Sequence, residues 1–153
     1  MSDEFLKYAD LLSTSIIGIV AVIITWRYSH VNKRISNDSI KHQLFTDFNQ
    51  RYSQLNHRLE EIAVNKMNWE MLRSNRTRRD HRNAVIDYLI LCAEERYWFK
   101  KERIEPEVWK SWQAGMNYWY GELPALREAW EEEKKQSGKE SYYLKEGEDL
   151  FGG

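Results

Sequence analysis

The sequence contains a single cysteine, Cys92, and only seven glycines and two prolines among 153 residues. One cysteine excludes an internal disulfide framework and a thiolate metal cluster within one chain. Few glycines and prolines argue against a β-sandwich or barrel, which needs turn residues at short intervals. Because long stretches contain neither residue while 42% of the chain is hydrophobic, we expect an all-α fold of about one domain.

The sequence also lacks the local motifs of common enzymes and metal sites. It has no G-x-S-x-G elbow, Walker loop or glycine pattern of a nucleotide-binding fold. Glu94 and Glu95 are adjacent on an expected helix, so they point in different directions and do not form a simple acid–base pair. We therefore expect no catalytic residue, no cofactor and no enzyme activity, with an unrecognised enzyme at a membrane surface as an open alternative. No metal site is expected either, because the histidines lack ligand spacing: His30, His42, His57 and His81.

One long uncharged run, LLSTSIIGIVAVIITW, occupies residues 11–26. At about 1.5 Å per residue, a helix from Tyr8 to Trp26 spans close to the roughly 30 Å hydrocarbon thickness of a bilayer. Tyr8, Trp26 and Tyr28 stand where interfacial aromatic residues belong. The run predicts a transmembrane helix within residues 1–29, and a hydrophobic helix inside a soluble domain is the alternative.

The charges that flank this run predict its orientation. A cleaved signal peptide would have a basic start and a small-residue cleavage site, and neither is present. By the positive-inside rule, the body is then cytoplasmic and the short N-terminus extracytoplasmic. We expect a single-pass protein of the inner (cytoplasmic) membrane, with the lipid bilayer as a partner. The basic residues after the run are Arg27, Lys33, Arg34 and Lys41, and the acidic residues before it are Asp3, Glu4 and Asp10.

Small side chains recur within the predicted membrane helix at spacings of four, three and four. Such a stripe lets helix backbones approach closely in lipid. It predicts a homo-oligomer, although small residues are also common in membrane helices that stay single. The candidate oligomerisation residues are Thr14, Gly18, Ala21 and Thr25.

Residues 30–135 are expected to form a small cytosolic helical bundle, followed by a charged, flexible tail at residues 136–153. The alternative for this tail is docking through its apolar side chains: Tyr142, Tyr143, Leu144, Leu150 and Phe151. Thr77 and Asp80 read as a capping box that starts a helix near Thr77 and runs it to about Lys101. Pro106 suits the first turn of the next helix, and Trp130 belongs to the last one. A continuous apolar stripe precedes them: Ile40, Leu44, Phe48, Tyr52, Leu55, Leu59 and Ile62.

The stretch CAEERYWFKKERIEPEVWKSWQAGMNYW, with its I-x-x-x-V-W-x-x-W-x-x-G-M pattern, resembles a group of small bacterial proteins. These carry one N-terminal membrane helix and a cytoplasmic helical domain. The resemblance covers about residues 85–130 and implies no activity. In architecture alone, the chain is also similar to membrane effectors of bacterial antiviral defence, including type III CRISPR effectors gated by cyclic oligoadenylate. That likeness identifies no residue.

The stretch RSNRTRRDHR, residues 73–82, places five arginines in ten residues of a nearly neutral chain. Arginines at a helix start oppose the helix dipole, so an anionic ligand would stabilise them, and guanidinium groups with free backbone N–H groups form phosphate sites. The alternative is a solvated turn whose arginines pair with nearby carboxylates. The candidate ligand-binding residues are Arg73, Arg76, Arg78, Arg79 and Arg82, with Trp98 as a stacking surface for a nucleobase.

These patterns lead to one hypothesis and one main alternative. The first is a membrane-anchored sensor whose cytosolic domain binds a phosphate-bearing ligand, such as a cyclic oligonucleotide, and acts through its membrane helix. A role in antiviral defence would fit it. The alternative is a membrane-tethered scaffold that recruits a protein partner, with arginines that serve only solubility. Duplex DNA is not expected as a partner, because the chain has 23 basic against 24 acidic residues.

Overall fold

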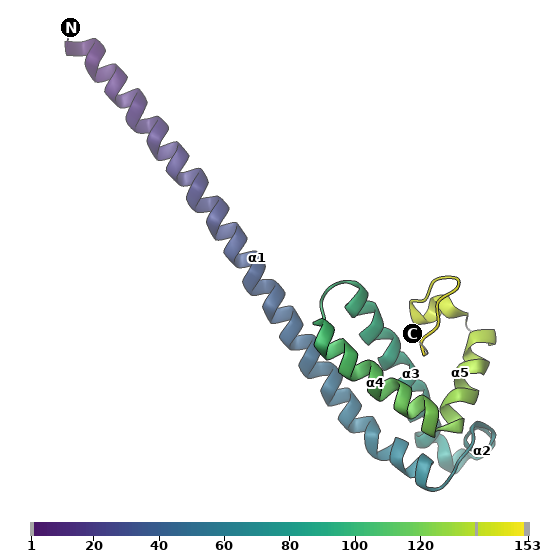
Figure 1. The fold of residues 1–153 in the computed structure, drawn as a ribbon. Helices are drawn as coiled ribbons and strands as arrows, with labels where there is room; N and C mark the ends of the chain where they lie inside the picture. Colours follow the sequence, from purple (N-terminus) through teal and green to yellow (C-terminus); the bar gives the residue numbers. More distant parts are fainter. Residues whose placement is uncertain (1, 137, 152–153) are drawn as a thin grey trace. The chain divides into compact units, whose positions relative to one another are not determined.

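The structure, a computed structural model, is all-helical in its described part, as the sequence predicts (Figure 1). It describes the backbone of residues 2–136 and 138–151 and the side chains of residues 18–136 and 138–151. The chain divides into two compact units, Met1–Ile40 and Lys41–Gly153. Its α-helices are α1 (Ser2–Val64), α2 (Trp69–Ser74), α3 (Arg79–Lys100), α4 (Pro106–Glu122) and α5 (Pro124–Gln136), and its 3₁₀ turns are η1 (Arg76–Arg78) and η2 (Lys139–Tyr142).

The first unit contains the early part of α1. Within the described residues, no helix keeps an apolar sequence for long enough to cross a membrane. Residues 8–17 of the predicted span lie outside the part whose side chains are described. The structure thus gives the transmembrane helix no support, and the span stays a prediction. The described apolar side chains here are exposed: Ile19, Val20, Val22, Ile23, Ile24, Trp26, Tyr28, Val31 and Ile35.

The second unit is built around one hydrophobic core. From α1, Phe48, Leu59 and Ile62 are buried, so the apolar stripe of residues 44–62 faces the core as expected. Helices α2, α3, α4 and α5 contribute the rest. The largest fully buried side chains are Trp130, Phe48, Leu59, Ile62, Leu72, Leu89, Leu91, Leu123, Leu126, Val85 and Cys92.

The start of α3 differs from the predicted capping box, which is wrong. Thr77 lies inside η1, and α3 begins two residues later at Arg79. Asn75 caps η1: its Oδ1 accepts from the backbone N of Thr77 at 2.9 Å and from the Thr77 hydroxyl at 2.7 Å. The N-cap of α3 is Arg78, which makes no side-chain cap hydrogen bond. Asn is as good a cap as Thr, and here it captures the hydroxyl that the capping box would have used.

The residues after α5 also differ from the flexible tail predicted at residues 136–153. Four apolar side chains in residues 138–151 are buried, so this segment completes the core. The Trp130 indole N–H donates to Asp149 at 2.8 Å, and the rings of Tyr120 and Phe151 stack at 4.3 Å. The buried residues are Tyr142, Leu144, Leu150 and Phe151.

Candidate functional site

The five arginines of residues 73–82 lie on three successive elements. Arg73 is in α2, Arg76 and Arg78 are in η1, and Arg79 and Arg82 are in the first turns of α3. Chain connectivity keeps them close together. The structure thus brings the predicted arginine cluster to one end of α3, with Arg78 and Arg82 partly buried and the other three exposed.

The arginine cluster divides into paired and unpaired members. Arg73 forms ion pairs with Glu132 at 2.7 Å and with Glu70 at 3.1 Å. The other four arginines have no ion pair among the described residues: Arg76, Arg78, Arg79 and Arg82. The alternative in which the arginines pair with nearby carboxylates therefore applies to Arg73 and not to the other four.

A shallow hollow beside the cluster is lined by Arg73 and Arg82, but it also contains carboxylates. Asp87, Glu132 and Glu133 share its wall. These negative charges oppose a phosphate group in the same place. An anion would have to bind outside the hollow, on the side of η1.

Trp98 is not brought to the arginine cluster. Arg79 and Trp98 are 19 positions apart on α3, which at about 1.5 Å per residue separates them by roughly 28 Å. Trp98 is partly buried and packs edge-on against Tyr97, with ring centroids 5.3 Å apart. One small nucleotide cannot contact both sites.

Of the predicted oligomerisation stripe, Gly18, Ala21 and Thr25 lie on α1, and Thr14 lies outside the residues whose side chains are described. Thr25 and Ala21 are exposed, and the Thr25 hydroxyl donates to the Ala21 carbonyl oxygen at 2.8 Å. A Cβ added at Gly18 meets nothing within 4 Å. The stripe is open to a partner, and self-association stays a prediction.

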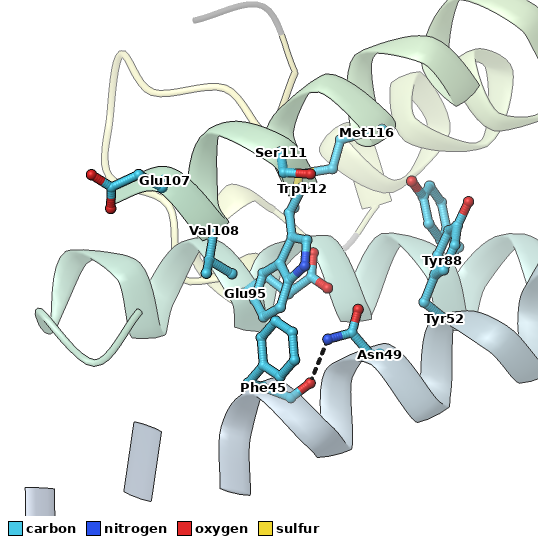
Figure 2. Close-up of a pocket in the computed structure, with 11 residues that line it drawn as sticks. Phe45, Asn49, Tyr52, Tyr88, Glu95, Glu107, Val108, Ser111, Trp112 and Met116 are labelled. Atoms are coloured by element: carbon cyan, nitrogen blue, oxygen red, sulfur yellow. Dashed lines mark hydrogen bonds between the residues drawn. The ribbon is translucent and has the colours of Figure 1, made fainter. Parts of the chain in front are cut away.

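A second site, which the sequence did not reveal, is a cleft between α1, α3 and α4 within residues 45–116 (Figure 2). We call it the aromatic cleft. Its volume is about 550 Å³, and apolar atoms form most of its wall. Helix α1 contributes Phe45, Asn49 and Tyr52, α3 contributes Tyr88 and Glu95, and α4 contributes Glu107, Val108, Ser111, Trp112, Gly115 and Met116.

Aromatic rings shape both ends of the aromatic cleft (Figure 2). The rings of Phe45 and Trp112 stack with centroids 6.0 Å apart, and Phe45 is 47% exposed. Tyr52 and Tyr88 pack at 6.4 Å, and the Tyr52 hydroxyl oxygen accepts a hydrogen bond from the Trp119 indole at 3.0 Å. Tyr52 is thus held by a hydrogen bond, while Phe45 is half exposed at the other end of the cleft.

Glu95 is the one buried charged residue in the described part of the chain, at 6% exposure. Its side chain lines the aromatic cleft, and no hydrogen bond or ion pair to its oxygens is present among the described residues (Figure 2). Burial raises the pKa of its carboxyl to about 8, against the lowering effect of Arg51 and with a smaller rise from Glu94. Glu95 is therefore largely protonated at neutral pH.

Arg51 does not neutralise Glu95 because it is held elsewhere. Its guanidinium donates to Glu94 at 2.5 Å and lies 3.8 Å from Asp47. Glu94 and Glu95 point to different surroundings, as their adjacent positions on a helix predict. Among the described residues, the Glu95 carboxyl thus has no hydrogen bond or ion pair, and Arg51 acts on it only through its charge.

The sequence did contain a signal for this site. Tyr88, Cys92 and Glu95 are spaced four and three apart, so Glu95 shares the buried face of α3. A glutamate on an apolar face is unusual, because buried carboxyls are nearly always paired. Its aromatic surroundings come from α1 and α4, and their approach depends on tertiary packing.

Among the described residues, no group of three or more side chains could hold a metal ion. No protein-family model matches the chain, and neither a curated protein nor a solved structure shows significant similarity to it.

Proposed function

We propose that this chain is a non-enzymatic binding protein, attached to a membrane by its N-terminal helix, that holds a small ligand in the aromatic cleft. The observation that carries the proposal is the buried Glu95 carboxyl, without a hydrogen-bond partner, at the wall of a cleft of about 550 Å³. This volume is within the roughly 300–1,000 Å³ of small-molecule sites, which combine apolar walls with a few polar groups. Glu107, the other carboxylate of the cleft, is exposed, so the site has no second buried carboxylate beside Glu95.

A substitution that fills the cleft tests ligand binding. Gly115 lines the cleft in α4, and a Cβ there meets nothing within 4 Å. We expect Gly115→Leu to keep the fold, because leucine is a better helix former than glycine by up to about 1 kcal/mol. Fragments of mixed chemistry that bind the wild type, detected by NMR, should fail to bind this variant.

Gly121→Leu is the matched control, since Gly121 is in the same helix, is equally open and does not line the cleft. It should bind the same fragments as the wild type. Equal fragment binding by both variants would place the ligand elsewhere.

Membrane attachment rests on the uncharged run of residues 11–26 and its flanking charges. We expect the whole chain to float with vesicles in a density gradient and a chain without residues 1–29 to stay at the bottom. A C-terminal reporter should be active only as a cytoplasmic one. Recovery of the whole chain in the vesicle-free fraction would contradict the anchor.

Pairing of anchors through Gly18, Ala21 and Thr25 would make the protein a homo-oligomer.

A second candidate function, sensing of a phosphate-bearing ligand by the arginine cluster, is favoured by the lack of ion pairs at Arg76, Arg78 and Arg79. We expect the double variant Arg78→Ala plus Arg79→Ala to keep or raise the melting temperature, because it removes mutual repulsion and an unfavourable dipole interaction. Binding of cyclic oligoadenylate, measured by calorimetry, should be lost.

Arg73→Ala is the comparison variant, because Arg73 alone has ion pairs to lose. It should cost up to about 1 kcal/mol of stability, as exposed ion pairs do. If the double variant is the less stable one and no nucleotide binds to the wild type, the cluster is a surface turn and this second candidate fails.

A further inference from the structure

The chemistry of the aromatic cleft narrows the class of ligand that fits it. Its only buried ionisable side chains are Glu95 and Tyr88, and both are acids. Glu95 is 6% exposed, and its carboxyl reaches the cleft without a hydrogen bond from any described residue. A ligand that supplies a donor or a positive charge gains that interaction. An anionic ligand would instead find no positively charged side chain among the residues that line the cleft.

The aromatic walls of the cleft also favour a positively charged ligand. Phe45, Trp112, Tyr52 and Tyr88 bring ring faces or edges to the cleft, and ring faces carry the negative part of the aromatic quadrupole. Cations bind over such faces, and cages of aromatic residues recognise quaternary ammonium groups. Carboxyl and rings thus act together on a cation.

The chain does not supply this cation itself. None of the residues that line the cleft is a lysine or an arginine. The nearest guanidinium interaction, from Arg51, is directed at Glu94 at 2.5 Å. A bare metal ion is a poor occupant, because Ca²⁺ and Mg²⁺ need about six or more oxygen ligands and the wall is mostly apolar.

We infer that the aromatic cleft binds an organic ammonium ion, whose positive charge lies against the Glu95 carboxylate while its apolar groups contact Phe45 and Trp112. The inference rests on the proposed binding function and names its ligand class. Because Glu95 is buried and unpaired in the free protein, the ligand replaces a proton: the carboxyl releases H⁺ to solvent as the ammonium ion enters.

Binding should therefore depend on pH through Glu95. Its pKa of about 8 means that a ligand of fixed charge gains about tenfold in affinity between pH 7 and pH 9. Burial raises the pKa of Tyr88 and of Cys92, so both stay neutral in this range. The titratable and charged groups around Glu95 are Arg51 and Tyr52 on α1, Tyr88, Cys92 and Glu94 on α3, and Glu107 on α4.

The test compares choline with 3,3-dimethyl-1-butanol, which has the same shape without the charge. Both are titrated into the whole chain while the Trp112 indole N–H is followed by NMR. We expect choline to bind at least about tenfold more tightly than the alcohol, in line with a desolvated cation–aromatic contact. Calorimetry in buffers of different ionisation enthalpy should show proton release at pH 7.

Two variants separate the effect of Glu95 from that of a carboxylate outside the cleft. Glu95→Gln should remove the pH dependence and most of the preference for choline, whereas Asp87→Asn, at an exposed position of the same helix that does not line the cleft, should change affinity by less than about threefold. Equal binding of both probes overturns the inference, as does no binding of either. Neither result contradicts the proposed function, which is tested separately by fragment binding to the wild type and to Gly115→Leu.

Discussion

Replacing Glu95 with glutamine is expected to raise the free energy of unfolding by on the order of 4 kcal/mol at alkaline pH and to change it little near pH 5. The cause is the burial of a carboxyl whose pKa is about 8 in the folded chain, against an ordinary value of 4.5. Glutamine keeps the shape of the side chain and never acquires a charge.

The sign of this effect follows from which state binds the proton. Between about pH 4.5 and pH 8 the folded chain retains the Glu95 proton and the unfolded chain has lost it. Stability therefore falls as pH rises through this range, by up to about 1.4 kcal/mol per pH unit, and levels off above it. Below the range both states are protonated, and wild type and variant should agree within about 1 kcal/mol.

Urea denaturation at about pH 5, 7 and 9 measures the effect. Glu148 does not affect the comparison between pH 5 and pH 9. Its ion pair with Lys100 lowers its pKa to about 2, so its contribution to the free energy of unfolding is lost only as the pH falls from 4.5 toward that value. Glu107→Gln is the control: it removes an exposed carboxylate of the same cleft and should change stability by less than about 0.5 kcal/mol at all three pH values. A wild-type stability that rises from pH 5 to pH 9, with Glu95→Gln parallel to it, would contradict the assignment.

The helices were predictable because local patterns decide them. The stripe of residues 44–62, Pro106 at the start of α4 and the break at Gly121 and Pro124 depend on neighbours a few positions away. The helix predicted to start near Thr77 begins at Arg79, but its capping box was wrong because Asn75 binds the Thr77 hydroxyl and caps the η1 turn before it.

The candidate sites were harder to predict because they join distant segments. Residues 73–82 stood out as a run of like charge, but whether each arginine pairs depends on α5, which brings Glu132 to Arg73 and leaves Arg79 without a partner. The aromatic cleft needs α1, α3 and α4 together, so its rings resemble ordinary core residues in the sequence. Only Glu95, on the apolar face of α3, stood out locally.

Trp130→Ala is expected to cost about 3–5 kcal/mol, a large share of the stability of a small domain. Trp130 is fully buried and joins α5 to the segment of residues 138–151. Its indole N–H donates to Asp149 at 2.8 Å, and its ring meets the edges of Tyr142 and Phe151 at 5.1 and 6.1 Å. Removing it leaves a cavity and releases Asp149.

The expected result includes a local effect as well as the loss of global stability. Without Trp130, the rings of Tyr142 and Phe151 lose an edge contact and Asp149 loses its hydrogen bond, so residues 138–151 should become sensitive to protease before the rest of the chain. Trp130→Phe keeps an apolar ring and loses only the hydrogen bond to Asp149, which should cost about 1 kcal/mol beyond the smaller ring volume. Trp26→Ala, at a residue that is 66% exposed, should leave both readouts unchanged. If Trp130→Ala unfolds at nearly the wild-type urea concentration, or if residues 138–151 are cleaved equally fast in the wild type, this segment is the solvated tail that its charges predicted and does not complete the core.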